Sequence, residues 1–258
     1  YEPTIRASAG LGKLSLAPDP DTYDKGFLHC DVLVIGAGPA GLSAALISAR
    51  SGARVILADE NFHMGGRLIS ETYEIDSESG VDWVTETMTE LSAFKNFRLL
   101  TRTTVYGAFD HGIYGALERR TDHLPTNEQK PRQVLWRIYA RRTILCAGAT
   151  ERLIAFGNND RPGVMQAGAT RAYVNRWGVA PGKRFAIFTN NNNGWRTAND
   201  LIEKGMEVAA VIDTRDRLSL ASPAGTSVVM GGRIVDTRGR HGIESFSLSN
   251  GQIIDADC

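Results

Sequence analysis

The segment that most constrains the fold is the glycine-rich turn Gly36-Ala37-Gly38-Pro39-Ala40-Gly41. It directly follows the apolar run 32–35, and apolar residues then recur at helical spacing over 42–49. In a G-x-G-x-x-G turn the first glycine permits a tight exit from a strand, the second lets a pyrophosphate approach the backbone, and the third lets helix and strand pack closely. With a second apolar run at 55–58 that ends in Asp59, this order predicts a Rossmann βαβ unit that binds an adenine dinucleotide.

The acidic pair after the second apolar run indicates which dinucleotides fit. Asp59 follows Gly41 at close to the spacing of about 20 residues expected for the acid that accepts hydrogen bonds from a ribose. A carboxylate in that place repels a 2′-phosphate, so NAD or FAD is favoured over NADP. Glu60 is adjacent, and either acid could reach the ribose.

Later segments extend the same pattern. Met64-Gly65-Gly66-Arg67 follows the acid, and an apolar strand at 143–146 runs into Ala147-Gly148. Between them, the runs 103–108, 114–118 and 134–138 predict a small antiparallel meander. In this order, the motifs resemble the glutathione-reductase-like FAD/NAD(P)-binding superfamily across residues 31–149. That resemblance implies that the Gly-Gly-Arg segment contacts the pyrophosphate.

After Gly148 the pattern restarts. A strand at 185–188, a turn at 190–194, a helix at 196–204 and a strand at 208–212 predict a second βαβ unit. Its turn holds four asparagines, which tolerate left-handed backbone but obstruct close approach to a pyrophosphate. We therefore expect this unit to be structural and to hold no dinucleotide.

The predicted fold class is α/β: a Rossmann-type parallel sheet with an antiparallel meander, plus a second, smaller βαβ domain, in a truncated two-dinucleotide-binding architecture. The predicted division is an N-terminal linker or strap at 1–30, a dinucleotide-binding domain at 31–150 and an incomplete second βαβ domain at 151–258. The chain begins at Tyr1 rather than Met and stops just after a strand-like run. We expect it to be a piece of a longer protein.

Composition narrows the class of function. The 29 basic and 29 acidic residues cancel, which gives no long-range attraction to nucleic acid or anionic membrane. No apolar run reaches a transmembrane length and no secretory signal is visible, so a cytoplasmic protein is predicted. The three cysteines form no pair, which argues against a disulfide reductase, and the five histidines show no metal-ligand spacing. No catalytic residue and no metal ligand is assigned.

A closer resemblance covers essentially the whole chain. Six stretches look like the alpha subunits of heterotetrameric sarcosine oxidases: 1–6, 9–12, 29–34, 121–125, 158–165 and 178–183. The resemblance implies an oxidoreductase acting on CH–NH groups, which converts sarcosine, O2 and tetrahydrofolate to glycine, H2O2 and methylene-tetrahydrofolate. It implies beta, gamma and delta subunits as partners, with oxidation at an FAD on beta, FMN at the subunit interface and tetrahydrofolate on a C-terminal domain outside this chain. NAD would occupy the first βαβ unit, which would hold the cofactor without being catalytic alone.

Two alternatives stay open from the sequence. One is a pyridine-nucleotide-dependent flavin oxidoreductase with FAD in the first βαβ unit, and the other is the alpha subunit of a proline or opine dehydrogenase. In each case the same residues are expected to contact the dinucleotide: Gly36, Gly38, Pro39, Ala40, Gly41, Asp59, Glu60, Gly65, Gly66, Arg67, Val105, Ala147 and Gly148.

Overall fold

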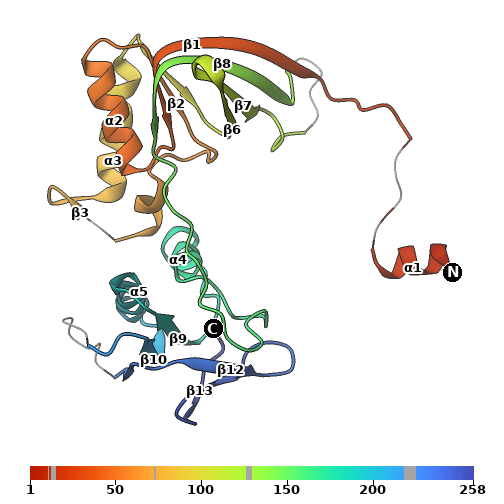
Figure 1. The fold of residues 1–258 in the computed structure, drawn as a ribbon, viewed down its shortest axis with the longest axis vertical. Coiled ribbons are helices and arrows are strands. Elements are labelled where there is room, and N and C mark those ends of the chain that lie inside the picture. The colour runs from red at the N-terminus through yellow and green to blue at the C-terminus, as the bar shows by residue number, and fades with distance from the viewer. Residues whose placement is uncertain (11, 13–15, 73, 126–129, 218–224) are drawn as a thin grey trace.

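The computed structural model describes residues 1–10, 12, 16–72, 74–125, 130–217 and 225–258. Two α/β units follow one another along the chain (Figure 1). The elements of the first unit are β1 (Tyr23–Ile35), α2 (Pro39–Arg50), β2 (Val55–Ala58), η1 (Gly66–Ser70), β3 (Glu74–Ile75), β4 (Glu78–Ser79), α3 (Gly80–Ala93), β5 (Phe97–Leu100), β6 (Thr103–Phe109), η2 (Asp110–Gly112), β7 (Ile113–Arg119) and β8 (Gln133–Leu145).

The first unit is built on a six-stranded sheet of order β5-β2-β1-β8-β7-β6. β5, β2, β1 and β8 run parallel, and β7 and β6 continue the sheet antiparallel. α2 and α3 lie together against one face of the sheet (Figure 1). The predicted fold class, a Rossmann-type parallel sheet with an antiparallel meander, is thereby confirmed.

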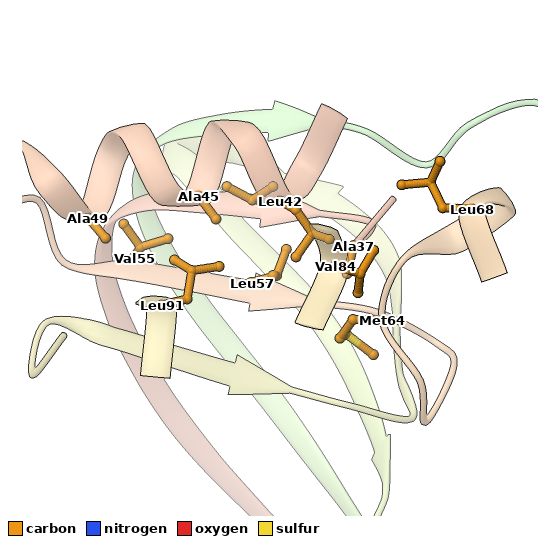
Figure 2. Packing of buried hydrophobic residues seen from close by; sticks show 11 residues of the cluster. Ala37, Leu42, Ala45, Ala49, Val55, Leu57, Met64, Leu68, Val84 and Leu91 are labelled. Atoms are coloured by element: carbon orange, nitrogen blue, oxygen red, sulfur yellow. The ribbon is translucent and has the colours of Figure 1, made fainter. Parts of the chain in front are cut away.

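The core between α2, α3 and the sheet explains why these segments form helices and strands. β2 is buried along its whole length, as expected for a strand covered on both faces. Leu42, Ala45 and Ala49 on α2 and Leu91 on α3 point into the same cluster (Figure 2). α3 begins where the sequence has a capping pattern of Ser79 followed by Asp82, and the Ser79 hydroxyl accepts the Asp82 N–H at 3.1 Å.

The second unit holds two three-stranded sheets. A parallel sheet has the order β11-β10-β9, and an antiparallel sheet has the order β12-β13-β14. Trp195 on α5 is 2% exposed and anchors the core between that helix and the parallel sheet. The elements are α4 (Ala167–Arg171), η3 (Ala172–Arg176), β9 (Arg184–Thr189), α5 (Asn192–Glu203), β10 (Glu207–Asp213), β11 (Ser227–Met230), β12 (Ile234–Arg238), β13 (Ser245–Leu248) and β14 (Ile253–Asp255).

The N-terminal region differs from its sequence-based expectation. We expected order to begin at Asp31, but β1 begins at Tyr23 and pairs with β8 from Gln133 onward. Leu28 and Cys30 alternate inward while aromatic side chains take the outward positions, so the two-residue period is hidden in the sequence. Helix α1 (Glu2–Ser8) buries none of its residues and lies apart from both units (Figure 1).

Two further expectations are corrected. The strands predicted at 134–138 and 143–146 are one 13-residue strand, β8. The short apolar runs at 228–229, 234–235 and 253–254 are consistent with a last meander, but residues 228–229 belong to β11, which extends the parallel sheet. The segment 121–132 reads as turn-rich in the sequence, and its residues 126–129 lie outside the described part of the chain. The division of the chain into domains at residues 30 and 150 stays a prediction.

Candidate functional site

The glycine turn between β1 and α2 packs tightly against neighbouring backbone at Gly36 and Gly41 and is open at Gly38. Gly36 has φ +99°, and a Cβ at Gly41 would collide with the Gly36 carbonyl oxygen. A Cβ at Gly38, in contrast, would meet nothing within 4 Å. The first turn of α2 carries no acidic residue, so the positive end of its dipole is not neutralised there. These features fit a pyrophosphate lying over Gly38 at the start of the helix.

Asp59 lies where β2 ends and faces the glycine turn. Its Oδ2 accepts the Ala37 N–H at 2.6 Å and its Oδ1 accepts the Asn61 N–H at 2.8 Å. A carboxylate offers about four acceptor positions, and these two bonds use one on each oxygen. The remaining positions fit the two hydroxyls of a ribose. Glu60 is exposed and also reaches the site, but it carries no comparable pair of backbone bonds among the hydrogen bonds of the described residues.

The Gly65-Gly66 pair folds back over the first turn. Gly65 donates its N–H to the Ala37 carbonyl at 2.8 Å and has φ +118°. A Cβ at Gly66 would lie 2.9 Å from the Gly38 Cα, so only glycine lets the segment pass this close. Arg67 is thereby placed at the same opening as Gly38.

A cavity of about 1070 Å³ opens above these segments and extends to the second unit. All thirteen residues expected to contact a dinucleotide line it except Gly41 and Gly65, which are buried behind the surface that their neighbours present. Val105 lies on β6, and Ala147 and Gly148 lie on the connection that leaves β8 toward α4 (Figure 1). The structure thus brings the predicted residues together around one cavity, and their roles as ligands stay predictions.

The cavity also has walls that sequence reasoning missed. Glu71, Glu151 and Gln166 line it, as do Asn190, Asn191 and Asn193 from the turn of the second unit. Glu71 follows Arg67 by one helical turn, which is a weak sequence signal for an ion pair. Nothing in the spacing of the asparagines indicates that their turn faces a cavity of the first unit.

The asparagine turn itself has a different structure from the one expected. Asparagines tolerate left-handed backbone, but none of the four here has a positive φ. Instead, Asn191 caps α5 by accepting the Asn193 N–H at 2.9 Å, so the helix begins at Asn192, four residues before the predicted start. Asparagine suits this position because its side-chain oxygen satisfies an N–H left without a partner at the helix start.

The acid of the second unit is already engaged by its own chain. Asp213 ends β10 and is 0% exposed. Its Oδ2 accepts the Trp195 indole N–H at 2.7 Å and an Arg215 Nη2 proton at 2.7 Å, while Oδ1 accepts the Arg215 backbone N–H. Burial alone raises the pKa of Asp213, but the hydrogen bonds from Arg215 and Trp195 outweigh burial and hold its pKa below the usual range. This carboxylate is therefore ionised and saturated, which fits the expectation that the unit holds no dinucleotide.

The cysteines carry no sign of nucleophilic chemistry. Burial, with a smaller contribution from Asp31, raises the pKa of Cys30 to about 11, and burial with Asp257 does the same for Cys258. Burial also raises the pKa of Cys146, which lines the cavity. Thiols with raised pKa values are protonated and poorly reactive near neutral pH. Among the described residues no group of histidines, cysteines and acids is arranged to hold a metal ion.

Comparison with known proteins identifies the relatives of the chain. Residues 31–93 match the family model described as FAD dependent oxidoreductase. The chain is 45% identical over 97% of its length to sarcosine oxidase subunit alpha of Rhizobium meliloti, and 43% identical over 93% to that of Corynebacterium sp. strain P-1. It covers 26% and 25% of those relatives, so it spans about a quarter of their length.

Among solved structures, L-proline dehydrogenase from P. horikoshii has a TM-score of 0.69 at 22% identity, over 92% of this chain and 42% of that one. At this identity the likeness shows the fold alone. Within the described residues no helix has both the length and the apolar character required to cross a bilayer.

Proposed function

We propose that this chain, which belongs to the sarcosine oxidase alpha-subunit family along nearly all of its length, is the NAD-holding segment of such a subunit. The observation that carries the proposal is the opening at Gly38, with the α2 dipole behind it and Asp59 beside it. Gly36, Gly38 and Gly66 would face the pyrophosphate, Asp59 or Glu60 the ribose, and Arg67 the phosphate charge. Bound NAD supplies an adenine dinucleotide whose nicotinamide can accept hydride.

What the residues of this chain do in the proposed function is bind and orient. The two backbone bonds fix the Asp59 carboxylate before a ligand arrives, so little side-chain entropy is lost on binding. The carboxylate also disfavours a 2′-phosphate, which excludes NADP. From the resemblance to sarcosine oxidase alpha subunits, we place the oxidation step on another subunit.

The whole assembly would then oxidise sarcosine with O2 and pass the one-carbon unit to tetrahydrofolate. This follows from the resemblance to sarcosine oxidase alpha subunits, as do the beta, gamma and delta partners, the FAD on beta and the FMN at the interface. A cytoplasmic location stays a prediction, since the chain offers no direct test of it.

The test is to purify the full protein and to identify the nucleotide that denaturation releases. We expect NAD, in about one copy per chain, and no flavin absorbance from the alpha chain when it is free of its partner subunits. A yellow alpha chain that releases FAD would contradict the NAD assignment. That result would favour the second candidate, a flavin oxidoreductase, which the match to the FAD dependent oxidoreductase model supports.

A further inference from the structure

One polar network joins the two units at the edge of the cavity. Arg171 at the end of α4 is 1% exposed, and its Nε donates to Asp200 on α5 at 2.7 Å. Its Nη1 donates to the Asn193 Oδ1 at 3.1 Å and lies 3.5 Å from the Glu71 carboxylate. A buried guanidinium with this many acceptors is fixed in place, because each lost contact would leave a charge uncompensated in the interior.

Asn193 is the residue at which this network reaches the dinucleotide cavity. Its Oδ1 accepts from both Arg171 and Arg67, each at 3.1 Å, and its Nδ2 donates to the Glu151 carboxylate at 3.3 Å. Glu151 is held in turn, because its Oε2 accepts the Gly168 N–H at 2.9 Å. The amide therefore has its oxygen between two cations and its nitrogen against an anion, which sets its orientation.

Arg67 is the residue whose geometry depends on this arrangement. Its side chain is 56% exposed, and its Nη2 bonds the Glu71 carboxylate at 2.5 Å and the Asn193 Oδ1 at 3.1 Å. Both contacts come from the same nitrogen: Glu71 holds it from the first unit, and Asn193 directs it toward the second unit. An exposed arginine without such contacts would sample many rotamers, and binding a ligand would have to restrict them.

We infer that the asparagine turn of the second unit is a part of the dinucleotide site of the first, and that Asn193 positions Arg67 toward the pyrophosphate. The inference rests on the proposed function, in that a pyrophosphate occupies the opening at Gly38. The second βαβ unit has an acid, Asp213, whose acceptors are already used by its own chain. In this inference the unit instead supplies a wall and a positioning residue for the ligand of the first unit.

The test compares two asparagines of one turn in the full protein after removal of bound nucleotide. Asn193→Ala should weaken the binding of ADP, which has a pyrophosphate but no nicotinamide or flavin, by about 5- to 10-fold, as for the loss of one ordinary hydrogen bond. Asn192→Ala is the matched control, since the Asn192 side chain bonds Arg215 and no other side chain of the described residues, and Asn192 does not line the cavity. It should leave ADP binding unchanged. Adenosine, which lacks phosphate, should bind equally to both variants.

Two further variants separate positioning from general loss of structure. Asn193→Asp combined with Glu151→Gln keeps an acceptor between the two arginines, a hydrogen bond between positions 193 and 151 and the net charge, and it should restore most of the ADP affinity. In an Arg67→Ala background, Asn193→Ala should have no additional effect, because it acts through Arg67. The inference is overturned if Arg67→Ala weakens ADP binding and Asn193→Ala does not, if adenosine binding falls in parallel, or if neither substitution has an effect.

The same assay distinguishes this inference from the proposed function. If the wild-type protein releases FAD but the ADP results are as expected, the NAD assignment fails and the role of Asn193 stands. If the wild-type protein releases NAD and Asn193→Ala binds ADP normally, only the role of Asn193 fails. If the wild-type protein binds neither ADP nor a dinucleotide, both fail.

Discussion

The two βαβ units of this chain share a topology and differ in whether their own residues occupy the ligand positions. In the first, the middle glycine of the turn faces open space and the acid after the second strand retains acceptor positions. In the second, Asn191 takes the helix-capping position that Gly38 holds in the first and accepts the Asn193 N–H with its side chain, and Asp213 is saturated by Trp195 and Arg215. The difference predicts that a strand, a turn, a helix and an acid make a dinucleotide site only where the chain leaves the acceptors of the acid free.

The largest effect is expected from two glycines of the first turn. Gly38→Ala adds a methyl group where no protein atom lies within 4 Å, so the fold should survive, while a pyrophosphate would meet the methyl group. We expect dinucleotide affinity to fall by about 100-fold, at the upper end of the overpacking range of 1–3 kcal/mol, with little change in Tm. Calorimetric titration and thermal unfolding measure the two quantities.

Gly41→Ala is the matched variant that should behave differently. Its methyl group would strike the Gly36 carbonyl, so both the affinity and the Tm should fall, the Tm by several degrees at about 2–4 °C per kcal/mol for a chain of this size. If both variants lowered affinity and Tm to the same extent, the glycines of this turn would serve only to pack the helix against the strand.

The two acids offer the next comparison. Asp59→Ala should reduce dinucleotide affinity by about tenfold, equivalent to one to two hydrogen bonds. Glu60→Gln is the control, and it should matter less because Glu60 is exposed and not held by the turn. If Asp59→Ala leaves retention intact and Glu60→Gln abolishes it, the neighbouring acid carries the ribose contact.

Asp213→Ala should lower stability and leave dinucleotide affinity unchanged, the reverse of what is expected for Asp59→Ala. It leaves the buried Trp195 indole N–H without its acceptor, so the unfolding free energy should fall by about 1–3 kcal/mol while dinucleotide affinity stays unchanged. Urea unfolding and titration in parallel measure this. A loss of affinity at constant stability would show that the second unit does take part in binding through its acid.

The candidate site of the first unit could be predicted from the sequence because the residues that it requires lie close together along the chain. Gly36, Gly38 and Gly41 are demanded by backbone geometry within one turn, and Asp59 follows at a fixed spacing. The role of Asn193 depends on Arg171 and Arg67, which are distant in the chain and meet only when the units pack. The early start of β1 at Tyr23 likewise depends on pairing with β8, over a hundred residues later. Such long-range pairing leaves no mark in local periodicity.

The pH dependence of stability gives a smaller effect, which concerns Asp213. The folded-state pKa of Asp213 is below its ordinary value, so its contribution to stability is full above about pH 4, the pKa of an unfolded aspartate. It is lost as the pH falls through the lower, folded-state value. The urea midpoints of the wild type and of Asp213→Asn should therefore differ at pH 6 and converge on acidification below pH 4. A difference that stays constant with pH would mean that packing, and not ionisation, is lost in the variant.

The smallest effect is expected on the labelling rates of the cysteines, which report which unit the ligand covers. Cys146 lines the cavity beside Ala147, whereas Cys258 lies in the second unit next to Met165 and does not line this cavity. Both thiols have raised pKa values, so labelling at pH 8 should be slow enough to follow by mass spectrometry. NAD should slow the labelling of Cys146 severalfold and leave Cys258 unchanged, with the buried Cys30 as the reference that reacts only on unfolding. Protection of Cys258 instead would place the ligand on the second unit and reverse the comparison, because the saturated acid there would then have to release its own partners to bind a ribose.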